Sequence, residues 1–292
     1  MNRILWTQKQ DVGPSPRVRS TMAYDSGRGR TVLFGGSGAL NFEDTWEWDG
    51  ANWTQMADSG PSARFGSAMA YDAERRQTVL FSGSRIPPDT WGWDGTNWTQ
   101  LADDGPPARD RSAMAYDSKR QRTVLFGGAG AAGALSDTWA WGGAAWTQLA
   151  ETGPSGRFDH SMAYDSSRDR MVLFGGETLG VIPGDTWEWD GAVWKQVSSF
   201  GAQPCLAAAV AFKGDSVALF GGSNNVDNLP SGVNGLTWTW DGQHWTPRQD
   251  FGPAPRSGHA MCYDSERASV VVFGGGSGSG VILGDTWELS EG

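Results

Sequence analysis

The sequence has little of what marks membrane, secreted or nucleic-acid-binding proteins. It contains two cysteines and three histidines, and its formal net charge is −10. No apolar run approaches the roughly 18 residues that a membrane-spanning helix needs. A strongly acidic chain is repelled by nucleic acid and by anionic membrane surfaces. We therefore expect no nucleic-acid partner, no membrane association, no signal peptide in these residues and a cytoplasmic location.

Motifs of several enzyme classes are also missing. The chain has no Walker phosphate-binding loop, no Gly-x-Ser-x-Gly nucleophile elbow and no dinucleotide fingerprint between a strand and a helix. No two histidines stand at the short spacing of a metal-binding pair. The cysteines, Cys205 and Cys262, are predicted to be free thiols, because Cys262 occupies a repeat position that holds alanine in other copies.

What the chain does contain is a unit repeated six times. An aspartate that ends the first apolar stretch recurs at steps of 47, 45 and 48 residues, with a lysine in its place in the fifth unit. These positions are Asp25, Asp72, Asp117, Asp165, Lys213 and Asp264. A later tryptophan recurs in step, at Trp46, Trp91, Trp139, Trp187, Trp238 and Trp287. Self-similarity at this period is typical of propellers and other repeat architectures.

Each unit holds four short stretches of strand-forming residues with turn signals between them. In the first unit these are residues 20–25, 31–34, 45–48 and 52–55, and Asp49-Gly50 suits a tight hairpin between the last two. Four antiparallel strands repeated six times predict an all-β fold, a six-bladed β-propeller. We expect residues 1–292 to form this propeller as a single domain.

The last unit supplies only three strands before the sequence ends. Leu5-Trp6-Thr7-Gln8 matches the Trp-Thr-Gln of the fourth strands at 53–55, 98–100 and 146–148. We therefore expect an N-terminal strand, about residues 4–8, to complete the C-terminal blade and close the ring. The 17 tryptophans all fit the repeat, so we interpret them as wedges between blades rather than as a sugar-binding platform.

The repeat resembles the Kelch repeat. A glycine pair such as Gly35-Gly36 ends the second strand, an aromatic residue and a tryptophan follow, and Pro-x-x-Arg precedes the first strand at 61–64 and 253–256. The resemblance covers about residues 4–289. It implies a propeller, and Kelch propellers serve as protein-binding modules, as scaffolds and less often as enzymes. The fold therefore leaves the function to be argued from the site.

The two faces of the predicted ring differ. The turns after the first and third strands are short and alike, whereas the loops after the second strand vary in length, and residues 223–235 form the longest. Variable loops on a rigid scaffold tend to carry binding sites. We therefore predict a ligand site on the face of these loops, offset toward blades four to six.

The same face carries an arginine at one repeat position in five of the six units. These are Arg17, Arg64, Arg109, Arg157 and Arg256. Guanidinium groups around one mouth would suit a carboxylate, a phosphate or an acidic peptide. The resemblance implies the same, because arginines at this place in some Kelch domains grip acidic side chains of a partner. A residue repeated so regularly can equally belong to the scaffold, so both interpretations stay open.

Departures from the repeat give a second candidate site. Histidine replaces serine in units four and six, at His160 and His259, and Asp159 precedes the first of them, while Cys205 stands at the arginine position of unit five. Two histidines and a carboxylate could hold a divalent metal such as zinc and activate its water for hydrolysis. Cys205 could act as a nucleophile. Histidine at this place in Kelch repeats is also often structural.

The sequence thus leads to two hypotheses. In the first, a monomeric Kelch-like propeller binds an anionic small molecule or an acidic peptide through the five arginines. In the second, the chain is a metal-dependent hydrolase of esters, lactones or phosphoesters, including phosphotriesters. His160, His259, Asp159 and Cys205 would then form its catalytic centre.

Overall fold

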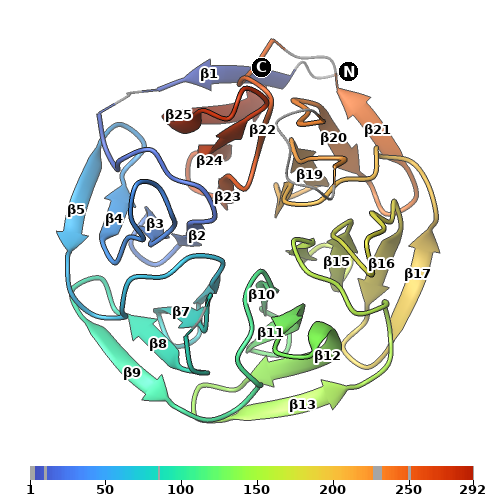
Figure 1. The fold of residues 1–292 in the computed structure, drawn as a ribbon, viewed down its shortest axis with the longest axis horizontal. Helices are drawn as coiled ribbons and strands as arrows, with labels where there is room; N and C mark the ends of the chain where they lie inside the picture. Colours follow the sequence, from blue (N-terminus) through green and yellow to red (C-terminus); the bar gives the residue numbers. More distant parts are fainter. Residues whose placement is uncertain (1–3, 10–11, 85, 226–231, 249–250, 292) are drawn as a thin grey trace.

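The computed structural model describes residues 4–9, 12–84, 86–225, 232–248 and 251–291. These residues form six antiparallel sheets around a central axis (Figure 1), which confirms the predicted all-β, six-bladed β-propeller. Within the described ranges, no helix is long and apolar enough to cross a membrane.

Blades one to five each consist of four consecutive strands, ordered from the axis outward. Blade one contains β2 Thr21–Asp25, β3 Arg30–Phe34, β4 Thr45–Trp48 and β5 Trp53–Ala57. Blade two contains β6 Ala68–Asp72, β7 Gln77–Phe81, β8 Thr90–Trp93 and β9 Trp98–Ala102. Blade three contains β10 Ala113–Asp117, β11 Arg122–Gly130, β12 Gly133–Trp141 and β13 Trp146–Ala150.

The next two blades follow the same order. Blade four contains β14 Ser161–Asp165, β15 Arg170–Phe174, β16 Thr186–Trp189 and β17 Trp194–Ser198. Blade five contains β18 Ala209–Phe212, β19 Val217–Phe220, β20 Thr237–Trp240 and β21 Trp245–Arg248. In every blade the second strand is almost fully buried, as expected for a strand with a neighbouring blade on each face.

Blade six joins the two ends of the chain. Its strands are β22 Arg256–Ser257, β23 Ala260–Asp264, β24 Ser269–Ser277, β25 Ile282–Glu291 and β1 Ile4–Gln8. Strand β1 pairs antiparallel with β25, from Ile4 opposite Glu291 to Gln8 opposite Trp287. Figure 1 shows blue β1 on the outside of the red strands. The N-terminal strand therefore closes the ring, as predicted.

Tryptophans hold neighbouring blades together in a repeated way. One tryptophan of each outer strand donates a hydrogen bond from its indole nitrogen to a threonine hydroxyl of the preceding blade, at 2.8–3.2 Å. The pairs are Trp53–Thr286, Trp98–Thr45, Trp146–Thr90, Trp194–Thr138, Trp245–Thr186 and Trp6–Thr237. Because Trp6 makes the contact made by its five counterparts, the closing strand is bound like any other outer strand.

A second tryptophan fills five of the six interfaces between blades. The indoles at the ends of the third strands are at most 1% exposed: Trp48, Trp93, Trp141, Trp189 and Trp240. Burying a ring of this size stabilises the interface by about 2–3 kcal/mol. In blade six the same position holds Leu289.

The strand order gives the ring two unlike ends. The loop face carries the segment that enters each first strand and the variable loop after each second strand. The turn face carries the short turns after the first and third strands, such as residues 25–30 and 49–52 in blade one.

Candidate functional site

The five arginines of the predicted ligand site lie inside the scaffold, each at most 2% exposed. Each guanidinium donates two hydrogen bonds to one aspartate, and for Arg109 the distances to the oxygens of Asp137 are 2.6 and 2.9 Å. A third bond goes to a main-chain carbonyl, that of Gly127 at 3.0 Å for Arg109. The pairs are Arg17–Asp44, Arg64–Asp89, Arg109–Asp137, Arg157–Asp185 and Arg256–Asp285.

This wiring favours the scaffold interpretation of the arginines. Two-point pairing with a carboxylate leaves little of the guanidinium for a ligand. Burial alone would raise the pKa of the Asp137 carboxyl, but the hydrogen bonds and charge of Arg109 outweigh it and hold the pKa below its usual value. Blade five lacks both partners of the pair, with Cys205 and Leu236 in their places. The arginine and the aspartate are expected to be absent together if the role of each is to pair with the other.

The structure does not bring His160, His259 and Asp159 together as a metal site. The His160 ring lies edge-on to Phe126 with the ring centroids 5.4 Å apart, and His259 lies similarly against Phe220 at 5.3 Å. The two imidazoles thus occupy separate interfaces between blades. Across the described parts of the chain, no group of three His, Cys, Asp or Glu side chains could hold a metal ion.

The electrostatics of the histidines and of Cys205 also argue against the predicted catalytic roles. Burial, assisted by Arg157 and Arg256, lowers the pKa of His160 and of His259 to about 3, so both rings are neutral and weakly basic. Cys205 is 2% exposed, and burial raises the pKa of its thiol to about 12. A thiol that stays protonated is a poor nucleophile. Both cysteines are free, as predicted.

A different set of residues lines the axis on the loop face. Six residues, one from each blade, form a closed ring of main-chain hydrogen bonds of 2.7–3.0 Å, each N–H donating to the carbonyl of the preceding member. All six have φ between 53° and 66°. They are Arg19, Gly66, Arg111, Asp159, Ala207 and Gly258. We call this set the axial ring.

Three charged side chains of the axial ring meet over the axis. Arg19 Nη2 lies 3.3 Å and Arg111 Nη1 lies 3.5 Å from Asp159 Oδ2. Arg111 Nε also donates to Asp110 at 3.1 Å, and its guanidinium lies 4.2 Å from the centre of the Phe158 ring. The two arginine side chains are 26% and 22% exposed, whereas Asp159 is 7% exposed. Burial raises the pKa of Asp159 more than the arginines lower it.

A cavity of about 140 Å³ lies on the axis at this level. Its lining comes from all six blades, through the axial ring and the residue that follows each member. The buried hydroxyl of Ser20, which lines this cavity, has no hydrogen-bond partner among the described residues. A second hollow of about 370 Å³ adjoins it between blades two and three, where Ile86 and Ala131 face Arg111. This candidate site is axial, and the predicted offset toward blades four to six stays a prediction.

Sequence reasoning missed Arg19 and Arg111. They stand two positions after the repeated arginine, where the six units hold Arg, Gly, Arg, Asp, Ala and Gly. This variation among otherwise similar units was the available signal. Of the predicted site residues, Asp159 and both histidines line the axial cavity, the five arginines and Cys205 do not, and Arg109 lines the adjoining hollow. The longest predicted loop, 223–235, includes residues 226–231, which lie outside the described residues.

Comparison with known proteins supports the fold. No protein-family model matches the chain. A solved structure titled "Structure of YjhT" superposes with a TM-score of 0.74 over 95% of this chain and 96% of that chain, at 14% identity. The dynein regulatory complex subunit 7 of Chlamydomonas reinhardtii is 38% identical over 79 residues, which are 26% of this chain and 7% of that protein. The chain is therefore similar to YjhT in architecture, and its activity has to be argued from the axial site.

Proposed function

We propose that the chain is a Kelch-type propeller that binds a small anionic molecule at the axial site of its loop face. The anionic group, a carboxylate or its equivalent, would lie between Arg19 and Arg111. The observation that carries this proposal is the number of N–H donors of the two guanidinium groups that make no hydrogen bond within the described protein. Each has five N–H donors, yet Arg19 donates one hydrogen bond and Arg111 two within the described protein. The remaining donors are available to a ligand.

Backbone conformation supports the same proposal. Residues of the axial ring lie in the left-handed region, which costs a non-glycine residue about 1 kcal/mol. Two of the six members are glycines, which adopt this conformation without that cost, whereas the other four, Arg19, Arg111, Asp159 and Ala207, do bear it. Outliers of this kind cluster at functional sites. Side chains kept there despite the cost are more easily explained by a ligand than by packing, because they lie at the solvent-facing end of the axis.

The adjoining hollow suggests the size of the ligand. Arg111 lines both the axial cavity and the hollow of about 370 Å³. A molecule with its anionic group on the axis could therefore extend over Arg111 toward Ile86. We do not propose a hydrolase, because no group of three His, Cys, Asp or Glu side chains in the described residues could hold a metal ion and Cys205 is a protonated, buried thiol.

Binding of benzenesulfonate, measured by isothermal titration calorimetry, tests the proposed function. Arg19→Gln and Arg111→Gln should each weaken binding about tenfold or more, because each removes a charge-assisted hydrogen bond. Arg30→Gln, on the turn face, is the matched control and should bind like the parent. Benzylammonium, of similar size and opposite charge, should not bind at this site. Unchanged affinity in both axial variants would overturn the proposal.

Asp159 should compete with the bound anion. Asp159→Asn is expected to strengthen benzenesulfonate binding about fivefold to tenfold, since it removes a negative charge and adds a donor. Asparagine tolerates the left-handed backbone at this position (φ 54°). The pKa of Asp159 is already raised, and an anion beside it would raise the pKa further. Affinity of the parent should therefore increase as the pH falls, and affinity of Asp159→Asn should stay flat.

A further inference from the structure

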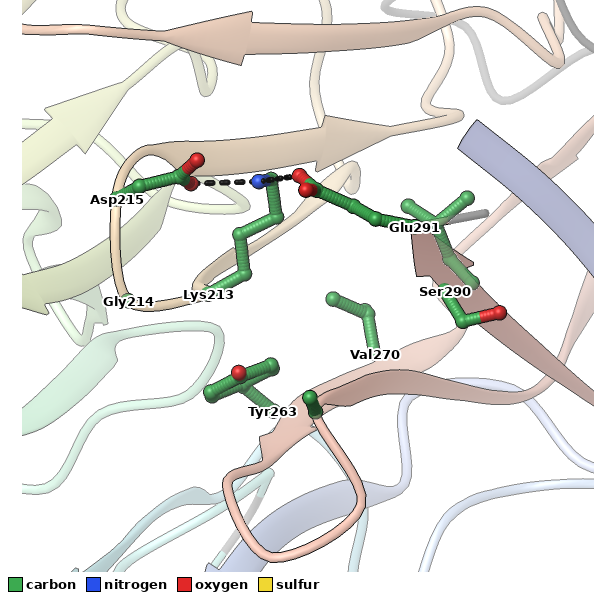
Figure 2. Close-up of a pocket in the computed structure, with 9 residues that line it drawn as sticks. Lys213, Gly214, Asp215, Tyr263, Val270, Ser290 and Glu291 are labelled. Carbon is green, nitrogen blue, oxygen red and sulfur yellow. Dashed lines mark hydrogen bonds and ion pairs between the residues drawn. The ribbon is translucent and has the colours of Figure 1, made fainter. Parts of the chain in front are cut away.

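A second cavity lies on the opposite face, between blades five and six. Its volume is about 300 Å³. Charged residues Lys213, Asp215 and Glu291 line one part of it, and Tyr263, Val270 and Leu289 line another. Figure 2 shows the Lys213 ammonium between the two carboxylates, with Tyr263 and Val270 facing the same space.

The other five interfaces fill this space with an arginine. The arginine of the turn after each first strand reaches over the hairpin glycine of the next blade, so closely that a Cβ at Gly95 would lie 2.5 Å from Arg28 Cζ. The five contacts are Arg28–Gly95, Arg75–Gly143, Arg120–Gly191, Arg168–Gly242 and Arg267–Gly50. In blade five the turn is two residues shorter, because Phe212 pairs with Val217 where Tyr24 pairs with Thr31. It supplies no arginine, and Glu291 stands at the glycine position.

The same interface also lacks its tryptophan. Leu289 occupies the position that holds a buried indole in the other five blades. The cavity therefore corresponds to a missing arginine at its rim and a smaller residue at its base. Two departures from an otherwise regular repeat coincide at one place, and together they leave a space with an apolar floor and a charged rim.

The charges of the rim favour a cation. Lys213 Nζ lies 2.5 Å from Asp215 Oδ1 and also pairs with Glu291, and Asp215 is the more exposed of the two carboxylates. Burial would raise the pKa of Asp215, but its hydrogen bond with Lys213 lowers it, so the carboxylate stays ionised near neutral pH. Burial raises the pKa of Tyr263 and keeps its phenol neutral. Asp215 is 67% exposed and Lys213 9%, so a ligand entering from solvent meets a carboxylate first.

We propose that this cavity binds a small aromatic molecule that carries an alkylammonium group. The aromatic ring would lie against Tyr263, Val270 and Leu289, where other interfaces bury an indole. The ammonium would lie beside Asp215 and Glu291, where other interfaces place a guanidinium. The site is on the turn face and is independent of the anion site on the loop face.

Tryptamine is the probe for this site, and indole-3-propionate, with a similar ring and the opposite charge, is its control. We expect the parent to bind tryptamine at about millimolar concentration and indole-3-propionate at least about tenfold more weakly. Ligand-observed NMR measures both. No binding of tryptamine, or equal binding of both compounds, would overturn the proposal.

Two variants locate the binding. Leu289→Trp should fill the cavity, raise the melting temperature and weaken tryptamine binding about tenfold or more. Asp215→Asn, at an exposed side chain where folding is not at risk, should weaken it about threefold to tenfold. Glu266→Gln, an exposed carboxylate elsewhere on the turn face, should change nothing. If tryptamine binds Leu289→Trp and Asp215→Asn like the parent, the cavity is a packing defect only and the proposal is wrong.

Discussion

Replacing Arg109 with cysteine is expected to lower the free energy of unfolding by about 3–5 kcal/mol, because it strands a largely buried carboxylate. Asp137, 16% exposed at its side chain, would lose the two hydrogen bonds that Arg109 donates. The carbonyl of Gly127 would lose its partner as well. Equilibrium unfolding in urea measures the loss.

Blade five provides the matched control for this experiment. Its Cys205 and Leu236 stand where blade three has Arg109 and Asp137. The double variant Arg109→Cys with Asp137→Leu should therefore be closer in stability to the parent than Arg109→Cys alone, since no buried charge is left unpaired. A loss below about 1 kcal/mol in the single variant, with no recovery in the double, would contradict the scaffold role.

Acid is expected to destabilise the protein through its two buried histidines. In the folded protein the pKa of each is lowered from 6.5 to about 3, first by burial and then by the adjacent Arg157 or Arg256. Between these values the unfolded chain binds protons that the folded chain does not. The stability from these groups is complete above pH 6.5 and is lost as the pH falls toward 3. The loss can reach about 1.4 kcal/mol per pH unit for each histidine.

The double variant His160→Ser with His259→Ser isolates this effect. Serine occupies the corresponding position in blades one to three, so the backbone accepts it. Urea unfolding between pH 7 and about 4 should show a flatter dependence for the variant than for the parent. The comparison uses the slope of the free energy of unfolding against pH rather than its absolute value, because the serine variant also loses the contacts with Phe126 and Phe220. Parallel curves would show that the histidines titrate normally.

The repeat made the architecture predictable. Because one unit recurs six times, a strand that is hard to predict in one copy can be predicted from the other copies. For the same reason, Leu5-Trp6-Thr7-Gln8 can be recognised as the outer strand that the last unit lacks. The structure confirms both the blades and the closing strand. The fold was predictable because the repeated residues make the same contacts in successive blades, such as the Trp–Thr hydrogen bonds between blades and the Arg–Asp pairs within them.

The recurring arginines left two interpretations open in the sequence, a ligand site and a part of the scaffold. In the structure, Arg17 and its four counterparts each pair with an aspartate before the third strand, which favours the scaffold. That pairing was visible in the sequence, since the Arg and the Asp are both absent from blade five. Arg19 and Arg111 could not be placed on the axis without the left-handed backbone that turns them there.

An NMR titration of the arginine Nε–Hε signals with benzenesulfonate tests most directly whether the buried arginines hold the ring and the axial arginines hold an anion. We expect saturable shifts of the signals from Arg19 and Arg111, and constant signals from Arg17, Arg64, Arg157 and Arg256, whose guanidinium groups are paired with aspartates. Shifts of these four signals, or no response from Arg19 and Arg111, would contradict the proposed roles.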